Sequence, residues 1–193
     1  MPGFALSASK PKKNAAKYFR PLRSPTVVLH AEGRSRAVSL IMSIILFLSI
    51  SLLVFFSDLV TKAYVSERLS LGQSIPVVKN IFHISLVHNT GIAFGLFKNL
   101  TAFFIGLSLI VIFYIALDSI LHLKYYTLNK GISFGLLLGG ACGNLLDRIR
   151  LGYVRDFLDF RVWPVFNLAD SAITIGVLLL AIEIIGNRTK NTA

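Results

Sequence analysis

The sequence predicts an all-α membrane protein with four transmembrane helices and a small extracytoplasmic β element. Of its 193 residues, 54% are hydrophobic and only 15% are charged, whereas soluble domains carry about a quarter charged residues. Four long runs contain few or no charges, as membrane-spanning helices require. Between these runs, two segments are rich in β-branched and aromatic residues, which favours strands.

The first element is a basic segment, residues 1–36. It holds eight Lys and Arg residues and a single acid, Glu32, so much of the net charge of +11 precedes the first apolar run. We expect a disordered cytoplasmic tail here. An organelle transit peptide is the alternative, because such peptides are rich in Arg and Ser and poor in acids. The position of this charge indicates a topology signal rather than a nucleic-acid partner.

The four apolar runs follow the tail. Ala37–Ser57 is uncharged and long enough to cross about 30 Å of hydrocarbon as a helix. Leu100–Leu117 is uncharged as well. Gly131–Leu146 is shorter, and Phe166–Ile185 contains two acids, so a hydropathy window identifies these two less clearly.

Small residues recur within the third run. Gly135, Gly139 and Gly143 are spaced four residues apart, which places them on one face of a helix. Such a stripe lets two membrane helices approach closely. We therefore expect this helix to pack tightly against a neighbour.

The predicted β element comes from two segments outside the apolar runs. Pro76–His88 has the β-branched and aromatic content of strands, and Tyr153–Val162 alternates roughly between apolar and polar residues. We expect these segments to form a small sheet that rests on the helices.

Positive charge sets the expected orientation. The basic tail places the N-terminus in the cytoplasm, and a four-helix domain over residues 37–187 returns residues 188–193 there as a second tail. The unusual polar residues then map to the outer side of the membrane. They are Asp58, Asn89, Asn144, Asp147, Arg148, Asp156, Asp159, Asn167 and Asp170. Ionisable groups near hydrocarbon are costly, so this convergence marks a candidate functional site.

Paired carboxylates are the chemistry that these residue types favour. Two nearby aspartates share one proton, so one can activate water while the other polarises a carbonyl group. Candidate members are Asp147, Asp156, Asp159 and Asp170. Asp147 precedes Arg148 and could be neutralised structurally, and Asp170 could be a helix N-terminal residue favoured by the dipole. Spacing alone does not choose the pair, and it shows no metal-ligand pattern.

Five short motifs resemble those of lipoprotein signal peptidases, the signal peptidase II family. Asp58–Lys62 is similar to the family element D-x-x-T/S-K, and Asn89–Gly95 is similar to N-x-G-x-A-F-G/S. Gly139–Arg148 followed by Gly152–Phe157 resembles G-G-A-x-G-N-x-x-D-R and G-x-V-x-D-F, and Phe166–Ile173 resembles F-N-x-A-D-x-x-I. Each motif alone is weak, but their order and spacing are specific, and together they cover about residues 38–186.

The resemblance implies a catalytic dyad of Asp156 and Asp170. It also implies supporting or substrate-binding roles for Asn89, Gly91, Asn144, Asp147, Arg148, Asn167, Asp58 and Lys62. The pair Asp58 and Lys62 would support the outer architecture; the alternative is an i, i+4 surface pair of small energetic value. Asp159 would be solvated or structural.

The resemblance further implies an intramembrane aspartyl endopeptidase that removes signal peptides from diacylglyceryl-modified prolipoproteins, cutting just before the lipidated cysteine. It implies a multi-pass protein of the bacterial inner membrane, in contact with membrane lipids, monomeric, inhibited by globomycin and working without a cofactor. The alternatives are a small transporter or proton-pathway subunit, and a structural membrane anchor. A proton relay should place acids at several depths, whereas this sequence concentrates them on the outer side.

Overall fold

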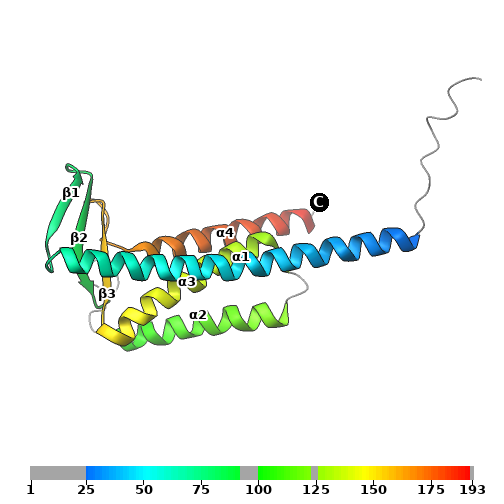
Figure 1. Cartoon of the computed structure of the whole chain (residues 1–193), viewed down its shortest axis with the longest axis horizontal. Helices are drawn as coiled ribbons and strands as arrows, with labels where there is room; N and C mark the ends of the chain where they lie inside the picture. Colours follow the sequence, from blue (N-terminus) through cyan, green and yellow to red (C-terminus); the bar gives the residue numbers. More distant parts are fainter. Residues whose placement is uncertain (1–24, 92–99, 123–125, 192–193) are drawn as a thin grey trace, which may run out of the picture. The chain divides into compact units, whose positions relative to one another are not determined.

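The computed structural model describes the backbone of residues 25–91, 100–122 and 126–191, and the side chains of residues 34–186 within those ranges. The chain divides into two units, Met1–Arg36 and Ala37–Ala193. The first helix begins at Pro25, within the segment that the sequence assigns to the tail. In chain order, the described elements in Figure 1 are α1 (Pro25–Arg68), β1 (Ser74–Val78), β2 (Phe82–Asn89), α2 (Thr101–Leu121), α3 (Leu128–Leu151), β3 (Val154–Asp159) and α4 (Leu168–Asn191).

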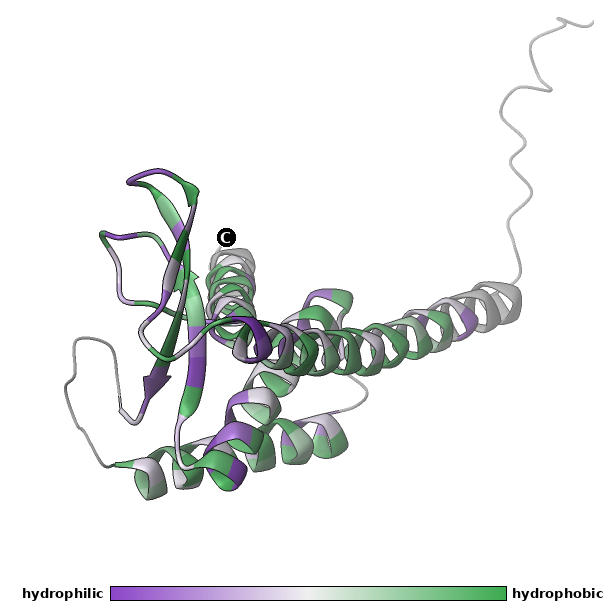
Figure 2. Cartoon of the chain, turned by 60° about the vertical axis from the view of Figure 1, so that its left-hand side comes forward, coloured by the Kyte–Doolittle hydropathy of each residue, from purple (hydrophilic) through white to green (hydrophobic). Residues whose placement is uncertain are grey.

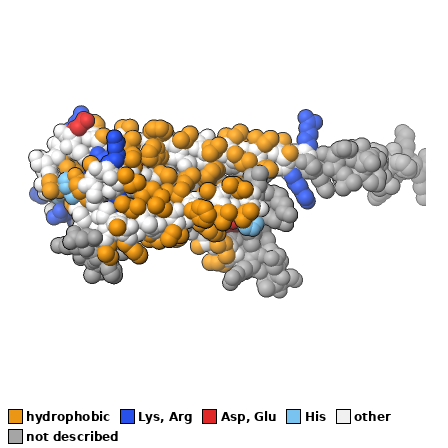
Figure 3. Space-filling view, turned by 90° about the horizontal axis from the view of Figure 1, so that it is seen from below, with side chains coloured by type: hydrophobic (Ala, Val, Ile, Leu, Met, Phe, Trp, Pro, Cys, Tyr) orange, Lys and Arg blue, Asp and Glu red, His pale blue; other side chains and the backbone are white. Residues whose placement is uncertain are grey.

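Within the described residues, three helical segments are long and apolar enough to cross a membrane. They are Arg34–Arg68 in α1, Thr101–Leu121, which is α2, and Leu168–Gly186 in α4. The prediction of a mostly helical membrane protein with a small sheet is therefore confirmed. Figure 2 shows hydrophobic residues along these helices, and Figure 3 shows few charged side chains along the middle of the visible helical face.

The third predicted run is also helical, within α3, but its composition does not mark it as a span. Charged residues lie near both ends of this helix, and glycines occur along it. The same helix has far more buried residues than its neighbours. Helix α3 is therefore less hydrophobic than the other helices because it lies between them.

The strands form one antiparallel sheet in the order β1–β2–β3. A turn divides the predicted strand segment Pro76–His88 between β1 and β2, and Asn80 in this turn has a φ of 63°. Asn adopts this left-handed conformation more readily than most side chains. At the other end of β2, Asn89 lies opposite Val154, and Val87 lies opposite Asp156. The sheet register therefore brings Asn89 close to Asp156.

Helix α3 packs against α2 and α4 and approaches α1 through glycines. A Cβ atom placed on Gly131, Gly135 or Gly139 would lie between 2.6 and 2.8 Å from a backbone carbonyl oxygen of α1. On another side of the helix, a Cβ on Gly140 would lie 2.6 Å from the carbonyl oxygen of Ala169 in α4. The predicted glycine stripe is thus confirmed, and it begins one turn earlier than the sequence indicates.

An apolar cluster fixes the sheet to the end of α1. Val65 of α1 and Leu69, directly after the helix, pack with Leu86 of β2 and Phe157 of β3, and all four side chains are buried. Successive side chains of a strand point to opposite faces, so anchoring Phe157 turns its neighbour Asp156 to the other face of β3. The core therefore sets the direction of this carboxyl.

Candidate active site

Asp156 on β3 is buried, with only 1% of its surface exposed. Its Oδ2 accepts a hydrogen bond from Asn89 Nδ2 at 2.8 Å, and its Oδ1 accepts one from Asn167 Nδ2 at 2.7 Å. The Asn89 amide is held in turn, because its Oδ1 accepts from the Gly91 backbone N–H at 3.0 Å. Each oxygen of the Asp156 carboxyl therefore faces an amide donor. The rest of the predicted Asn89–Gly95 motif, residues 92–95, lies outside the described residues.

Asp170 lies in the first turn of α4. The side chain of Asn167 accepts from the Asp170 N–H at 2.9 Å, and Asp170 Oδ2 accepts from the Asn167 N–H at 3.2 Å. This reciprocal pair caps the helix as a capping box does, and the helix dipole favours a negative charge at this end. Because the Asn167 amide also donates to Asp156, one residue links both carboxyls.

Asn144 brings helix α3 into the same network. Its Nδ2 donates to Asp170 Oδ1 at 2.7 Å. Its Oδ1 accepts from Asn167 Nδ2 at 3.1 Å and from Lys62 Nζ at 2.9 Å. Three helices and the sheet therefore meet around the two acids.

Asp58 and Lys62 form a buried ion pair in α1, so the alternative of a surface pair is wrong. Their side chains are each 1% exposed, and Lys62 Nζ lies 2.6 Å from Asp58 Oδ2. Asp58 Oδ1 also accepts the Ala169 N–H at 3.0 Å. The pair ties α1 to the first turn of α4 and, through Asn144, to α3.

Asp147 is neutralised by Arg155 of β3 rather than by its neighbour Arg148. Arg155 Nη2 lies 2.7 Å from Asp147 Oδ1, and Arg155 Nε donates to Oδ2 at 3.2 Å. The Arg148 guanidinium instead lies 5.0 Å from the centre of the Phe104 ring, a distance typical of a cation–π contact. Arg148 thereby lines the same cavity as Asp156 and Asp170.

Asp159 is buried at 6% exposure, so of the two expected roles, solvated or structural, the burial supports the structural one. Ser85 Oγ donates to its Oδ2 at 2.7 Å, and Arg161 contributes a backbone N–H at 2.9 Å and a guanidinium N–H at 3.1 Å. Desolvation by itself would raise the pKa of Asp159, but these donors outweigh it and hold the pKa below its usual range. Asp159 is therefore a stable carboxylate of the sheet, apart from the linked pair.

The surroundings of Asp156 raise its pKa, whereas those of Asp159 lower the pKa of that residue. Burial, and then the negative charge of Asp170, raise the pKa of Asp156 to about 7, although donors from Asn89 and Asn167 and the charge of Lys62 act against this rise. A carboxyl with this pKa holds a proton in mildly acidic solution and releases it near neutrality. Beside a second acid, it can serve as a proton donor or acceptor.

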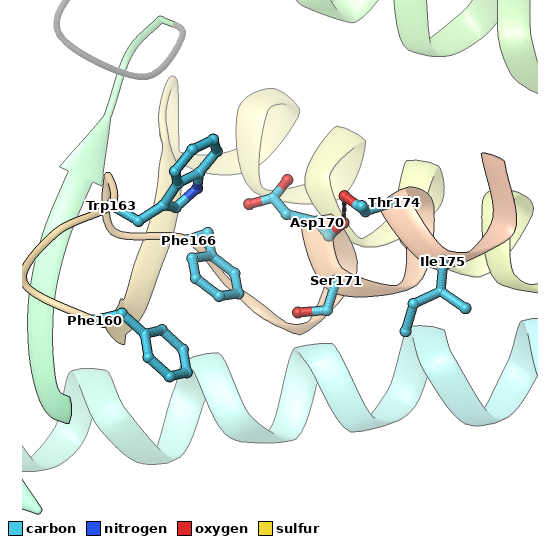
Figure 4. A pocket seen from close by; sticks show the side chains of 7 residues that line it. All are labelled: Phe160, Trp163, Phe166, Asp170, Ser171, Thr174 and Ile175. Atoms are coloured by element: carbon cyan, nitrogen blue, oxygen red, sulfur yellow. Dashed lines mark hydrogen bonds between the residues drawn. The ribbon is translucent and has the colours of Figure 1, made fainter. Parts of the chain in front are cut away.

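Asp170 lines three cavities, which places its carboxyl at their junction. The polar cavity, about 280 Å³, also contains Asp156, Asn89 and Arg148. An apolar cavity of about 230 Å³ lies among α2, α3 and α4 and includes Phe104. The largest, about 520 Å³, is drawn in Figure 4 and is lined by Phe160, Trp163, Phe166, Asp170, Ser171, Thr174 and Ile175. The dyad candidates therefore adjoin both polar and apolar space.

Some residues around these cavities are not identified from the sequence. Trp163 is the only tryptophan of the chain and lies between the two predicted acids, which is a signal that could have found it. Phe104 stands in an apolar run with many other phenylalanines, so nothing distinguishes it. The pairing of Arg155 with Asp147 depends on the fold, since the residues lie on a strand and a helix.

Comparisons with known proteins agree on one family. A family model described as signal peptidase (SPase) II matches residues 50–186. A lipoprotein signal peptidase of Halothermothrix orenii is 45% identical, over 67% of this chain and 88% of that protein. One of Moorella thermoacetica is 44% identical, over 72% of this chain and 92% of that protein. A solved structure described as a bacterial membrane enzyme has a TM-score of 0.70 at 30% identity, covering 75% of this chain and 90% of that chain.

Proposed function

The chain belongs to the signal peptidase II family, and on this basis we propose that it removes signal peptides from diacylglyceryl-modified prolipoproteins by cutting just before the lipidated cysteine. The observation that carries the proposal is the pair of carboxyls, Asp156, which is buried, and Asp170, which is partly buried; they are linked through Asn167 and line one cavity. This arrangement suits an aspartyl endopeptidase.

The two carboxyls share one proton in the resting site. The ionised member takes a proton from water as the water oxygen attacks the scissile carbonyl carbon. The protonated member gives its proton to the carbonyl oxygen. When the carbon–nitrogen bond breaks, the leaving amine takes the proton that came from water. The collapsing hydroxyl group of the intermediate returns a proton to the other carboxyl, so the site regains its starting state. Asp156 suits proton transfer at neutral pH because its pKa is raised to about 7.

The surrounding residues orient this pair. Asn89 and Asn167 hold Asp156, while Asn144 and the Asn167 backbone hold Asp170. Gly91 supports Asn89 through its backbone N–H. Arg148 lines the polar cavity and offers a positive charge for the partial negative charge that develops on the scissile carbonyl oxygen before it is fully protonated.

The remaining polar residues support the architecture of the site. Asp58 and Lys62 join α1 to α3 and α4, and Asp147 joins α3 to β3 through Arg155. The apolar cavities beside Asp170 suit the hydrophobic signal segment and the acyl chains of the substrate. Because both parts of such a substrate lie in the bilayer, it can enter sideways between helices.

Helix α3 is proposed as a fourth membrane span. Its buried residues outnumber those of the other helices, and α1, α2 and α4 lie around it, so its polar groups need little contact with lipid. Four spans place both termini in the cytoplasm of a bacterial cell and the sheet with the dyad at the outer face of the inner membrane. A single chain supplies every residue of this site, which suits a monomer.

The arrangement of acids favours a peptidase over a proton-pathway subunit. Among the described residues, the buried acids gather near the sheet. Asp118 and Glu183, from the other ends of their helices, pair with Lys130 and Thr127 respectively. A proton relay across the membrane would need further acids at depths between those near the sheet and those at the other helix ends.

Mass spectrometry of cleavage by detergent-purified protein tests the proposal. A diacylglyceryl-modified prolipoprotein should be cut once, directly before the modified cysteine, and the same protein without the lipid should remain intact. Globomycin should block the reaction. Cleavage of both substrates alike, or at a different bond, would contradict the proposed specificity.

A further inference from the structure

Lys62 is a buried cation that does not contact either carboxyl of the proposed dyad. Its ammonium nitrogen lies 2.6 Å from Asp58 Oδ2, 2.9 Å from Asn144 Oδ1 and 3.5 Å from Asp147 Oδ2. A lysine ammonium has three hydrogens and can only donate. Here one hydrogen bond goes to Asn144 Oδ1, and the charge forms ion pairs with the carboxylates of Asp58 and Asp147. A buried ammonium group must be paired or hydrogen-bonded, so it restricts the orientation of the side chains that accept from it.

The contact with Asn144 fixes which way the amide points. Lys62 and Asn167 Nδ2 both donate to the same atom, at 2.9 and 3.1 Å. That atom must be the carbonyl oxygen, because a flipped amide would place N–H groups against two donors and lose a charge-assisted hydrogen bond. The NH₂ group of Asn144 consequently faces Asp170 and donates to its Oδ1 at 2.7 Å.

We propose that Lys62 is a positioning residue for the dyad, which acts through Asn144 to hold Asp170 as the ionised member while the shared proton rests on Asp156. This inference rests on the proposed function, because it assigns the two roles of one hydrolysis. Asp170 takes the proton of the attacking water, and Asp156 gives its proton to the carbonyl oxygen. The leaving amine then receives a proton from Asp170, and Asp156 is reprotonated from the collapsing hydroxyl group.

Other charges around the pair agree with this assignment. Lys62 and Asp58 face the site from α1, and Arg148 and Asp147 face it from α3, with Arg155 of β3 paired to Asp147. Asp170 also stands at the N-terminus of α4, where the helix dipole favours an anion. Asp156 lies on a strand, so no helix dipole favours its anion as one does for Asp170. Burial and the charge of Asp170 raise the pKa of Asp156.

The pH profile of the variant Lys62→Met tests this role. Met has a similar length but no charge and no N–H, so it can neither fix the Asn144 amide nor favour an anion. We expect kcat to fall about 10²-fold because the reacting groups lose their alignment, with a smaller change in KM. The acidic limb of the profile should move to higher pH by about one unit, because the dyad takes up a proton more readily.

Removing Lys62 alone leaves Asp58 buried without its partner, so Lys62→Met/Asp58→Asn is the second variant. It removes both charges and retains a side-chain oxygen for the Ala169 N–H. The same shift of the limb in either folded variant supports the proposal. A fall in kcat of equal size at every pH, with the limb unmoved, shows a purely structural role and overturns it. Lys79→Met, at an exposed lysine in the turn after β1, is the matched control and should keep the wild-type profile.

Infrared spectroscopy separates this inference from the proposed function, because it requires no turnover. A protonated carboxyl band that Asp156→Asn removes should be present in wild-type protein at mildly acidic pH. Its titration should shift to higher pH in Lys62→Met/Asp58→Asn. If the wild-type protein shows the band and the variant shows the shift, but the wild-type protein does not cut the lipidated substrate, the function is wrong and the role of Lys62 stands. If it cuts the substrate and Asp156→Asn leaves the band, the assignment of the proton is wrong.

Discussion

The Asp156 carboxyl sets the expected pH dependence of the reaction. Burial and the charge of Asp170 raise its pKa to about 7, so Asp156 holds its proton below this pH and loses it above. We predict that kcat/KM falls as the pH rises through about 7, because the pair then lacks its proton donor. A profile of initial rates across neutral pH, with a substrate free of titratable groups near the cut, measures this limb. A rate that stays constant or rises over that interval would contradict a raised pKa at Asp156.

Asp159 gives the contrast within the same strand. Asp159→Asn should leave kcat/KM nearly unchanged, since this residue is separate from the linked pair, but should lower Tm by about 2–4 °C through weaker hydrogen bonds. The pKa of Asp159 lies below its usual range, so its contribution to stability is present above that range and disappears as the pH falls through the lowered pKa. Thermal unfolding of both proteins at neutral and at acidic pH measures this. A large loss of turnover with unchanged Tm would give Asp159 a direct role in the chemistry.

Among single residues, the sequence predicts the members of the network better than their partners. Asp156, Asp170, Asn89, Asn144 and Asn167 all meet in the structure. The motifs place each of them near a helix end or strand end, which is why their convergence can be anticipated. The burial of Lys62 and the pairing of Asp147 with Arg155 cannot be read from spacing, because both depend on how elements distant in the chain pack together.

At the scale of elements, the close approach of α3 to α1 makes a stability prediction. A Cβ on Gly139 would lie 2.6 Å from Ser51 O and 2.8 Å from Val54 Cβ. Gly139→Ala should therefore destabilise the protein by about 1–3 kcal/mol through overpacking. Gly106→Ala in α2 is the matched control, because a Cβ there meets nothing within 4 Å and Ala favours the helix. Thermal unfolding in detergent compares the two, and an equal Tm for both variants would show that α3 can move away from α1 at little cost.

The elements themselves follow from the sequence to different degrees. The candidate spans in α1, α2 and α4 follow from long runs of apolar residues. Helix α3 is harder to recognise because its neighbours cover it, so it needs no apolar surface of its own. The β segments are recognisable from composition, but the turn that divides β1 from β2 depends on the conformation of Asn80. Residues of β2 and β3 pack at the end of α1, and β1 pairs with β2 as an exposed edge strand.

For the whole molecule, the proposed arrangement of four spans predicts that the sheet lies outside the cell membrane and both termini lie inside. The variant Lys79→Cys, made in a Cys142→Ala background, places the one cysteine of the chain in the β1–β2 turn. In cells whose outer membrane has been opened, this cysteine should react with a membrane-impermeant maleimide. A C-terminal green fluorescent protein should fluoresce, as it does in the cytoplasm. Labelling at Lys79 only after disruption of the inner membrane would reverse the proposed orientation and place the dyad on the wrong side for exported substrates.

Single-turnover cleavage of a lipidated prolipoprotein by Asp156→Asn and Asp170→Asn proteins is the most direct measurement. Each substitution keeps the size of the side chain but removes a proton-transfer group, which should lower the rate by about 10²–10⁴-fold or more, while membrane insertion and Tm remain close to wild type. The Asp159→Asn protein should cut at nearly the wild-type rate in the same assay. Wild-type turnover by either dyad variant would show that the two carboxyls joined through Asn167 do not perform the hydrolysis.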